Sequence, residues 1–111
     1  MAVIIRSLAD GPVPSPNTNN LYPSSGGVAA GKAVIVKNMR FVNKGTSPAT
    51  LNVYFSGASQ RQILPLDLQL PPGFALVDDQ ELTLEAGDKI EGKASTANVD
   101  FVISGVERDV L

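Results

Sequence analysis

The chain has 111 residues, a formal net charge of −2 at neutral pH, and neither cysteine nor histidine. This length suits one domain around one core, because two cores would each be too small to be stable. Without these two residue types there is no disulfide, no thiol nucleophile, no Ser-His-Asp catalysis and no histidine ligand for a standard metal-dependent cupin.

The N-terminal part of the chain is expected to form a short strand followed by an arm. The apolar run at residues 2–8 predicts the strand. Residues 10–20 combine three alternating prolines with turn formers such as Asp, Gly and Asn, and proline lacks a backbone donor, so neither a helix nor a central strand fits. With the glycine-rich stretch that follows, residues 10–31 predict a long loop, either a solvated connector or an arm that contacts a neighbouring subunit.

The strongest strand signal lies at residues 32–43, where both faces are partly apolar. Such a strand either lies centrally in a sheet or switches faces at a bulge near Lys37 and Asn38. After a turn at residues 43–48, strict alternation at residues 50–56 predicts a strand with one wet face, which includes Tyr54. We expect this strand to form a hairpin with its predecessor.

The second half of the chain predicts further short strands. In residues 64–70, leucine occupies every second position, which would place four leucines on one face of a strand. Pro65 favours an edge or interrupted strand. Strand signals then recur about every 8 to 12 residues, and no helical period is found. The expected fold is an all-β, jelly-roll-like antiparallel β-sandwich, a single domain over residues 1–111, with residues 10–31 as the long Pro-rich loop or arm.

Carboxylates are the remaining candidates for chemistry. Asp78, Asp79 and Glu81 are close enough in sequence to form an oxygen site for calcium. They match no EF-hand spacing, and a full site needs six or more oxygens, so a solvated acidic turn is the favoured interpretation. Nothing selects a pair of carboxylates for glycoside hydrolysis. We therefore expect no catalytic, metal-binding or cofactor-binding residues, and a protein that is not an enzyme.

Other binding partners are constrained by composition. The nine basic residues occur singly rather than as a stripe, which argues against nucleic acid. No apolar run approaches the roughly 18 residues that span a bilayer, and no basic leader region precedes the first apolar run, so we expect no membrane span and no classical export signal. Carbohydrate binding usually uses exposed Trp or Tyr, and only Tyr22 and Tyr54 are present, either of which could equally contact a protein.

Several segments resemble small jelly-roll virion proteins of tailed bacteriophages. They are Ala30–Gly45, Leu51–Phe55, Leu84–Gly92 and Ala94–Glu107. The resemblance of each segment alone is weak, because a turn such as Ala-Gly-Asp occurs in many β-sandwiches. The order and spacing of the four segments carry the resemblance more strongly. Among these virion proteins, the chain is similar to the capsid decoration, or staple, proteins of epsilon-fifteen-like podophages.

The resemblance implies a non-enzymatic protein that is made in the host cytoplasm and lies on the outer surface of an icosahedral head. There it would join neighbouring major capsid protein subunits and pair with itself as a dimer. Similar modules occur in tail, baseplate and host-adhesion proteins, and the shared motifs do not separate the two settings. The expected protein-contact residues are Pro12, Val13, Pro14, Pro16, Asn17, Leu21, Tyr22 and Tyr54.

Overall fold

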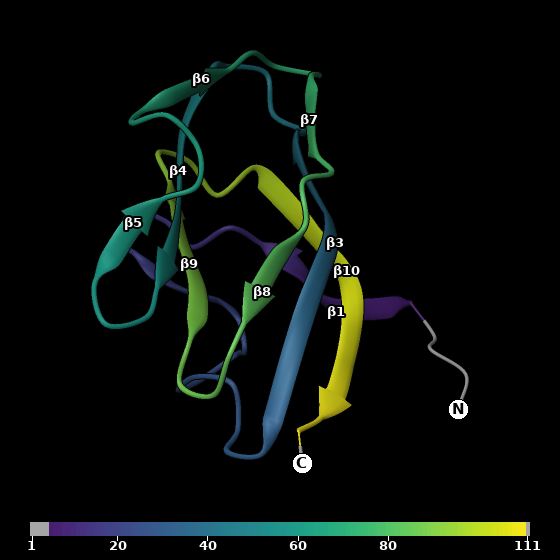
Figure 1. Cartoon of the computed structure of the whole chain (residues 1–111). Helices are drawn as coiled ribbons and strands as arrows, with labels where there is room; N and C mark the ends of the chain where they lie inside the picture. The colour runs from purple at the N-terminus through teal and green to yellow at the C-terminus, as the bar shows by residue number, and fades with distance from the viewer. Residues whose placement is uncertain (1–4, 111) are drawn as a thin grey trace.

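The computed structural model describes residues 5–110 as two antiparallel β-sheets packed face to face, with no helix in that range (Figure 1). The strands are β1 (Arg6–Pro12), β2 (Asn19–Tyr22), β3 (Lys32–Asn43), β4 (Ala49–Ser56), β5 (Gln60–Gln62), β6 (Leu68–Leu70), β7 (Ala75–Asp78), β8 (Leu82–Leu84), β9 (Lys89–Ala94) and β10 (Val99–Asp109). The expected all-β sandwich is therefore confirmed. The strand expected at residues 2–8 lies partly outside the described residues, and its described part runs further along the chain than predicted.

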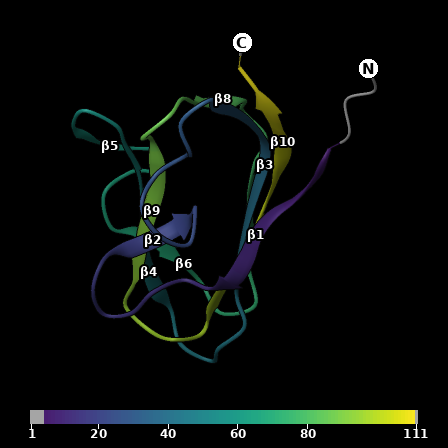
Figure 2. The same ribbon diagram turned by 90° about the horizontal axis from the view of Figure 1, so that it is seen from below.

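Strand order identifies the sandwich as a jelly roll. Sheet A has the order β1-β10-β3-β7, with β8 also paired to β3, and sheet B has the order β2-β9-β4-β5, with β6 also paired to β4. Figure 2 shows the two sheets as separate layers. Consecutive strands such as β1 and β2, β3 and β4, and β9 and β10 lie in opposite sheets, which is how a jelly roll closes its core. The hairpin expected between β3 and β4 is therefore wrong.

The core lies between the sheets and is built mainly from aliphatic side chains. Inward-facing positions alternate with outward-facing ones along each strand. Each Val, Leu, Ile or Phe side chain removed from water contributes roughly 1.5–3 kcal/mol. The largest fully buried apolar residues are Phe41, Met39, Leu51, Leu84, Ile90, Ile103, Val13, Val34, Val36, Val53 and Val99.

A β-bulge divides the long central strand pair. The register of β10 against β3 shifts between Ser104 and Gly105, opposite Lys37. Inward positions on β3 are consequently even-numbered up to Val36 and odd-numbered from Met39 onward. The bulge expected near Lys37 is confirmed, and β3 is also central, because it is paired on both sides.

The prediction that one face of β4 is exposed to solvent is wrong. Asn52, Tyr54 and Ser56 are 2%, 8% and 8% exposed. Directly opposite neighbours on the same face of a sheet are close enough to cover one another, and Tyr54 lies between Gln62 on β5 and Glu91 on β9. The buried Ser56 hydroxyl has a hydrogen-bond partner, because it donates to the Glu91 carboxylate.

The expected arm at residues 10–31 is not shown. Its beginning is the end of β1, and residues 19–22 form β2. Between the two strands, Val13 is 1% exposed and its N–H donates to the Val99 carbonyl at 2.7 Å, while the Pro14 carbonyl accepts from the Ala94 N–H at 2.8 Å. The prolines exclude a continuous strand, but the residues between them still carry donors and apolar side chains. The segment therefore crosses from one sheet to the other as part of the fold.

Candidate protein-interaction surfaces

The outer side of sheet A carries neighbouring apolar side chains that the fold leaves in water. Two of them, Val77 and Val102, are 53% and 41% exposed. Cross-strand register aligns them with other outward-facing residues in two rows. One row is Val77, Arg40, Val102 and Asp10, and the next is Ala75, Val42, Asp100 and Pro12. We call these eight residues the sheet A face.

Charges on the sheet A face have a defined arrangement. Asp100 pairs with Lys44 at 3.2 Å. Arg40 and Asp10 form no ion pair with any residue in the described range 5–110. They lie on either side of Val102, one on β3 and one on β1. Two strand spacings separate their Cα atoms, about 10 Å. As far as residues 5–110 show, the face therefore presents an unpaired cation and an unpaired anion on either side of Val102.

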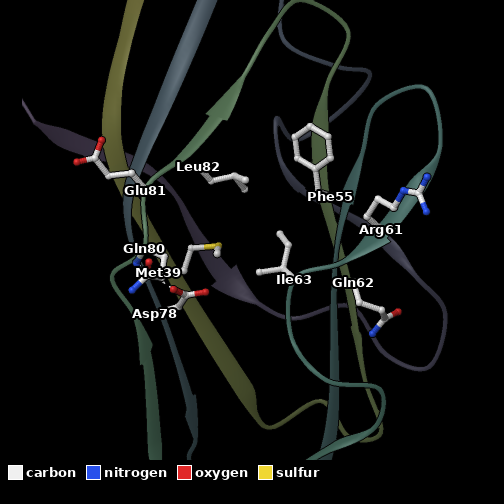
Figure 3. A pocket seen from close by; sticks show the side chains of 9 residues that line it. All are labelled: Met39, Phe55, Arg61, Gln62, Ile63, Asp78, Gln80, Glu81 and Leu82. Atoms are coloured by element: carbon white, nitrogen blue, oxygen red, sulfur yellow. Dashed lines mark hydrogen bonds between the residues drawn. The ribbon is translucent and has the colours of Figure 1, made fainter.

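A cleft of about 400 Å³ opens between the two sheets on the side of β7, β8 and β5 (Figure 3). We call it the seam cleft. Its apolar lining consists of Met39, Phe55, Ile63 and Leu82. Its polar lining consists of Arg61, Gln62, Asp78, Gln80 and Glu81.

The seam cleft exists because two short strands share one side of β3. β7 pairs with Met39–Val42 and β8 pairs with Val34–Val36, so Lys37 and Asn38 belong to neither register. The residues that join β7 to β8 leave the sheet at this gap, beside the bulge. Lys37 still holds that connection, with its Nζ 2.9 Å from Oε2 of Glu81.

The acidic turn considered for calcium forms one wall of the seam cleft rather than a closed ring of oxygens. Glu81 is engaged by Lys37, and Oδ1 of Asp78 accepts from the Gln80 N–H at 3.0 Å. Asp79 does not line the cleft. Among the residues that the structure describes, no group of three or more carboxylates is placed to hold a metal ion.

A second cleft, of about 460 Å³, lies on the opposite side of the sandwich, between β1 and β2. The Tyr22 hydroxyl on its wall donates to Oε2 of Glu107 at 3.2 Å. Burial raises the pKa of Tyr22, and the Glu107 carboxylate raises it further. This pair links the edge of sheet B to the end of β10, so it supports the fold.

The structure separates the expected contact residues into two groups. Pro12, Pro16 and Asn17 are exposed and Pro14 is half-buried. The other four, Val13, Leu21, Tyr22 and Tyr54, are buried within this chain. They were predicted to be accessible because their burial depends on partners far away in sequence. Pro12 is the one member of that set on the sheet A face, and the local sequence around Val77 and Arg40 carries no signal that brings them together.

No family model matches this chain, and no curated protein matches it. In residues 5–110, no helix is long and apolar enough to cross a membrane.

Proposed function

We propose that this chain is a structural virion protein that binds the outside of a phage head and staples neighbouring major capsid protein subunits. The observation that carries the proposal is the sheet A face, where Val77 and Val102 stay exposed in one cross-strand row on either side of Arg40. Adjacent exposed apolar side chains rimmed by polar groups are typical of protein-binding surfaces. The resemblance of four chain segments to phage decoration proteins supports the choice of partner.

Self-association as a dimer is part of this proposal, and the part of the sheet A face centred on Val102 supports it, which leaves Val77 on β7 for contact with the capsid. A two-fold interface uses the same patch on both copies, so the patch must be complementary to itself. A two-fold axis along β10 would place Val102 against its own copy and Arg40 of each copy opposite Asp10 of the other. Asp100 would also face its copy, but Lys44 already neutralises it.

Binding to heads tests the function directly. Purified protein should bind mature heads of its own phage and raise their resistance to heat and to chelation. Many copies on one particle would reinforce one another through avidity, so weak single contacts suffice. Failure to bind those heads would remove the proposal. Immunogold labelling at the tail tip would instead support the alternative, a tail, baseplate or host-adhesion module of the same sandwich type.

A matched pair of variants identifies the surface used. Val77→Lys places a charge at the edge of the sheet A face, whereas Leu66→Lys places the same charge at the most exposed large apolar residue, 72% exposed and outside the face. Both sites are exposed, so both variants should fold. We expect Val77→Lys to weaken head binding and Leu66→Lys to leave it unchanged.

A further inference from the structure

The seam cleft contains a carboxylate in an apolar setting. Asp78 is half-buried and lies at the inner side of β7, next to Met39 and Leu82 in the cleft lining. In Figure 3 its side chain points toward the middle of the cleft, where Met39, Ile63 and Leu82 converge. No cation pairs with Asp78 among residues 5–110. Within the same range, the carboxylate of Asp78 accepts one hydrogen bond, from the Gln80 backbone N–H.

The neighbouring carboxylate is in a different situation. Glu81 belongs to the same wall, but Lys37 already neutralises it, and Figure 3 shows its side chain directed away from Ile63 and Leu82. Arg61 is the cation in the cleft lining, but Figure 3 shows its guanidinium directed away from Asp78 and Met39. Asp78 is therefore the charge that points into the apolar part of the cleft. A half-buried carboxylate favours an opposite charge close by, because water screens the pair less than at an open surface.

The apolar part of the cleft sets the second requirement. Met39 forms a floor that is 1% exposed, and Ile63, which follows β5, and Leu82 on β8 also line the cleft (Figure 3). Covering these groups with an aliphatic side chain removes apolar surface from water on both sides of the contact. Met39 is unbranched and adapts to the shape of what it contacts.

We propose that the seam cleft binds an extended segment of a partner protein that carries an aliphatic side chain next to a lysine or arginine. The aliphatic side chain contacts Met39, Ile63 and Leu82, and the basic side chain pairs with Asp78. The side chains set the specificity, because β7 and β8 are short and separated edge strands that offer little ladder for strand addition. The inference does not require the partner to be a capsid protein.

Short peptides test this inference on the intact protein. The probes are the capped peptides Ac-Gly-Leu-Lys-Gly-NH2, Ac-Gly-Leu-Glu-Gly-NH2 and Ac-Gly-Ala-Lys-Gly-NH2, followed through the methyl resonances of Met39, Ile63 and Leu82. We expect saturable shifts with the Leu-Lys peptide and clearly weaker binding of the other two. Absence of saturable shifts at these methyl groups, or equal binding of the Leu-Glu peptide, would overturn the inference.

Two neighbouring aspartates provide a matched pair of variants. Asp78→Asn removes the charge but keeps an oxygen for the Gln80 N–H, whereas Asp79→Asn makes the same change outside the cleft lining. Asp78→Asn should weaken binding of the Leu-Lys peptide about three- to tenfold. The variant should no longer prefer the Leu-Lys peptide over the Leu-Glu peptide. Equal effects of the two variants would contradict the role of Asp78.

One further probe separates an extended segment from any small amphipathic cation. If n-pentylammonium chloride binds as tightly as the Leu-Lys peptide, the cleft does not recognise a protein segment and the inference is wrong. These measurements need no phage heads. Failure of head binding would therefore leave the peptide result standing, and failure of the peptides would leave the stapling function to be judged by head binding.

Discussion

Asn52 and Asp67 hold each other through two reciprocal hydrogen bonds. The Asn52 amide donates to Oδ1 of Asp67, and the Asp67 backbone N–H donates to Oδ1 of Asn52, both at 2.9 Å. Asp67 has a φ of +52°, the one positive value among the non-glycine residues that the structure describes. The pair joins the edge of sheet B across the break between β5 and β6, where Pro65 removes a backbone donor.

Replacing Asn52 should therefore destabilise the protein. Asn52→Ala removes both hydrogen bonds at a position that is 2% exposed, and at about 0.5–1.5 kcal/mol for each bond we expect a loss of about 1–3 kcal/mol. Urea unfolding followed by circular dichroism measures the loss. Asn17→Ala, at an exposed position with no hydrogen bond of this kind, is the control and should change the free energy of unfolding little. Equal effects of the two substitutions would show that the pair contributes nothing.

Gly105 marks the bulge that lets β3 switch its inward face. A Cβ atom at Gly105 would lie 2.1 Å from the carbonyl oxygen of Ile35. Backbone cannot move aside cheaply, so Gly105→Ala should cost at least about 2–4 kcal/mol. Gly26→Ala is the matched control, since Gly26 has a positive φ but open space around it, and should cost only about 1 kcal/mol. Thermal unfolding of both variants distinguishes a steric cost from a conformational one.

Ionisation of Glu91 should make the free energy of unfolding depend on pH. The hydrogen bond from Ser56 is the main cause that lowers the pKa of Glu91 below its ordinary value of 4.5, with smaller contributions from Gln60 and Lys89, while burial opposes them. Because the folded pKa is below the unfolded one, the carboxylate stabilises the fold above about pH 4.5. That contribution is lost as the pH falls through the folded pKa.

Ser56→Ala tests this dependence. Without the hydroxyl, the pKa of Glu91 should move back toward its ordinary value, so the variant should lose less stability than the wild type between pH 6 and pH 3. Gln60→Ala should produce the same change to a smaller extent. Denaturant unfolding at a series of pH values measures both. Parallel pH profiles for Ser56→Ala and the wild type would show that the Ser56 hydrogen bond does not hold the carboxylate charged.

Local signals in the sequence predicted much of the fold. Alternating apolar residues and Gly or Pro turns act over a few positions, so they identified most of the strands, the bulge near Lys37 and the interruption at Pro65, but not β2 or β5. The candidate surfaces could not be predicted in this way. The sheet A face combines residues from β1, β3, β7 and β10, and the register that aligns Asp10, Arg40 and Val77 is a property of the assembled sheet.

The crossing segment at residues 10–31 shows the same limit. The three prolines within residues 10–20 were a sound reason to exclude a helix or a central strand there. They did not indicate that the Val13 N–H donates to the Val99 carbonyl or that the Val13 side chain is buried, since Val99 lies more than eighty residues away. The same holds for Tyr54, whose cover comes from residues on two other strands.

Val13 should consequently be a stability residue. Val13→Ala removes two methyl groups from a position that is 1% exposed, and we expect a loss of about 1–2.5 kcal/mol. Pro16→Ala, at an exposed position of the same segment, should have little effect. Deletion of residues 11–19 should prevent folding, because it also removes the hydrogen bonds to Val99 and Ala94. A deletion variant that folds normally would restore the interpretation of this segment as an arm.

Arg40 and Asp10 allow the proposed dimer to be tested by charge exchange. If each copy places Arg40 opposite Asp10 of the other, Arg40→Asp alone and Asp10→Arg alone each bring like charges together twice per dimer. Repulsion at directly opposed positions should weaken self-association by at least about tenfold. Sedimentation velocity over a concentration series measures this effect for each variant alone.

The mixture of the two variants is the decisive sample. One copy then carries two acidic groups and the other carries two basic groups at these positions, so a heterodimer regains two opposite-charge contacts. We expect the equimolar mixture to associate although neither variant does so alone. Because both residues are exposed and form no ion pair in the described chain, folding should be unaffected. A mixture that stays monomeric, while the wild type dimerises, would show that the copies meet through a different surface.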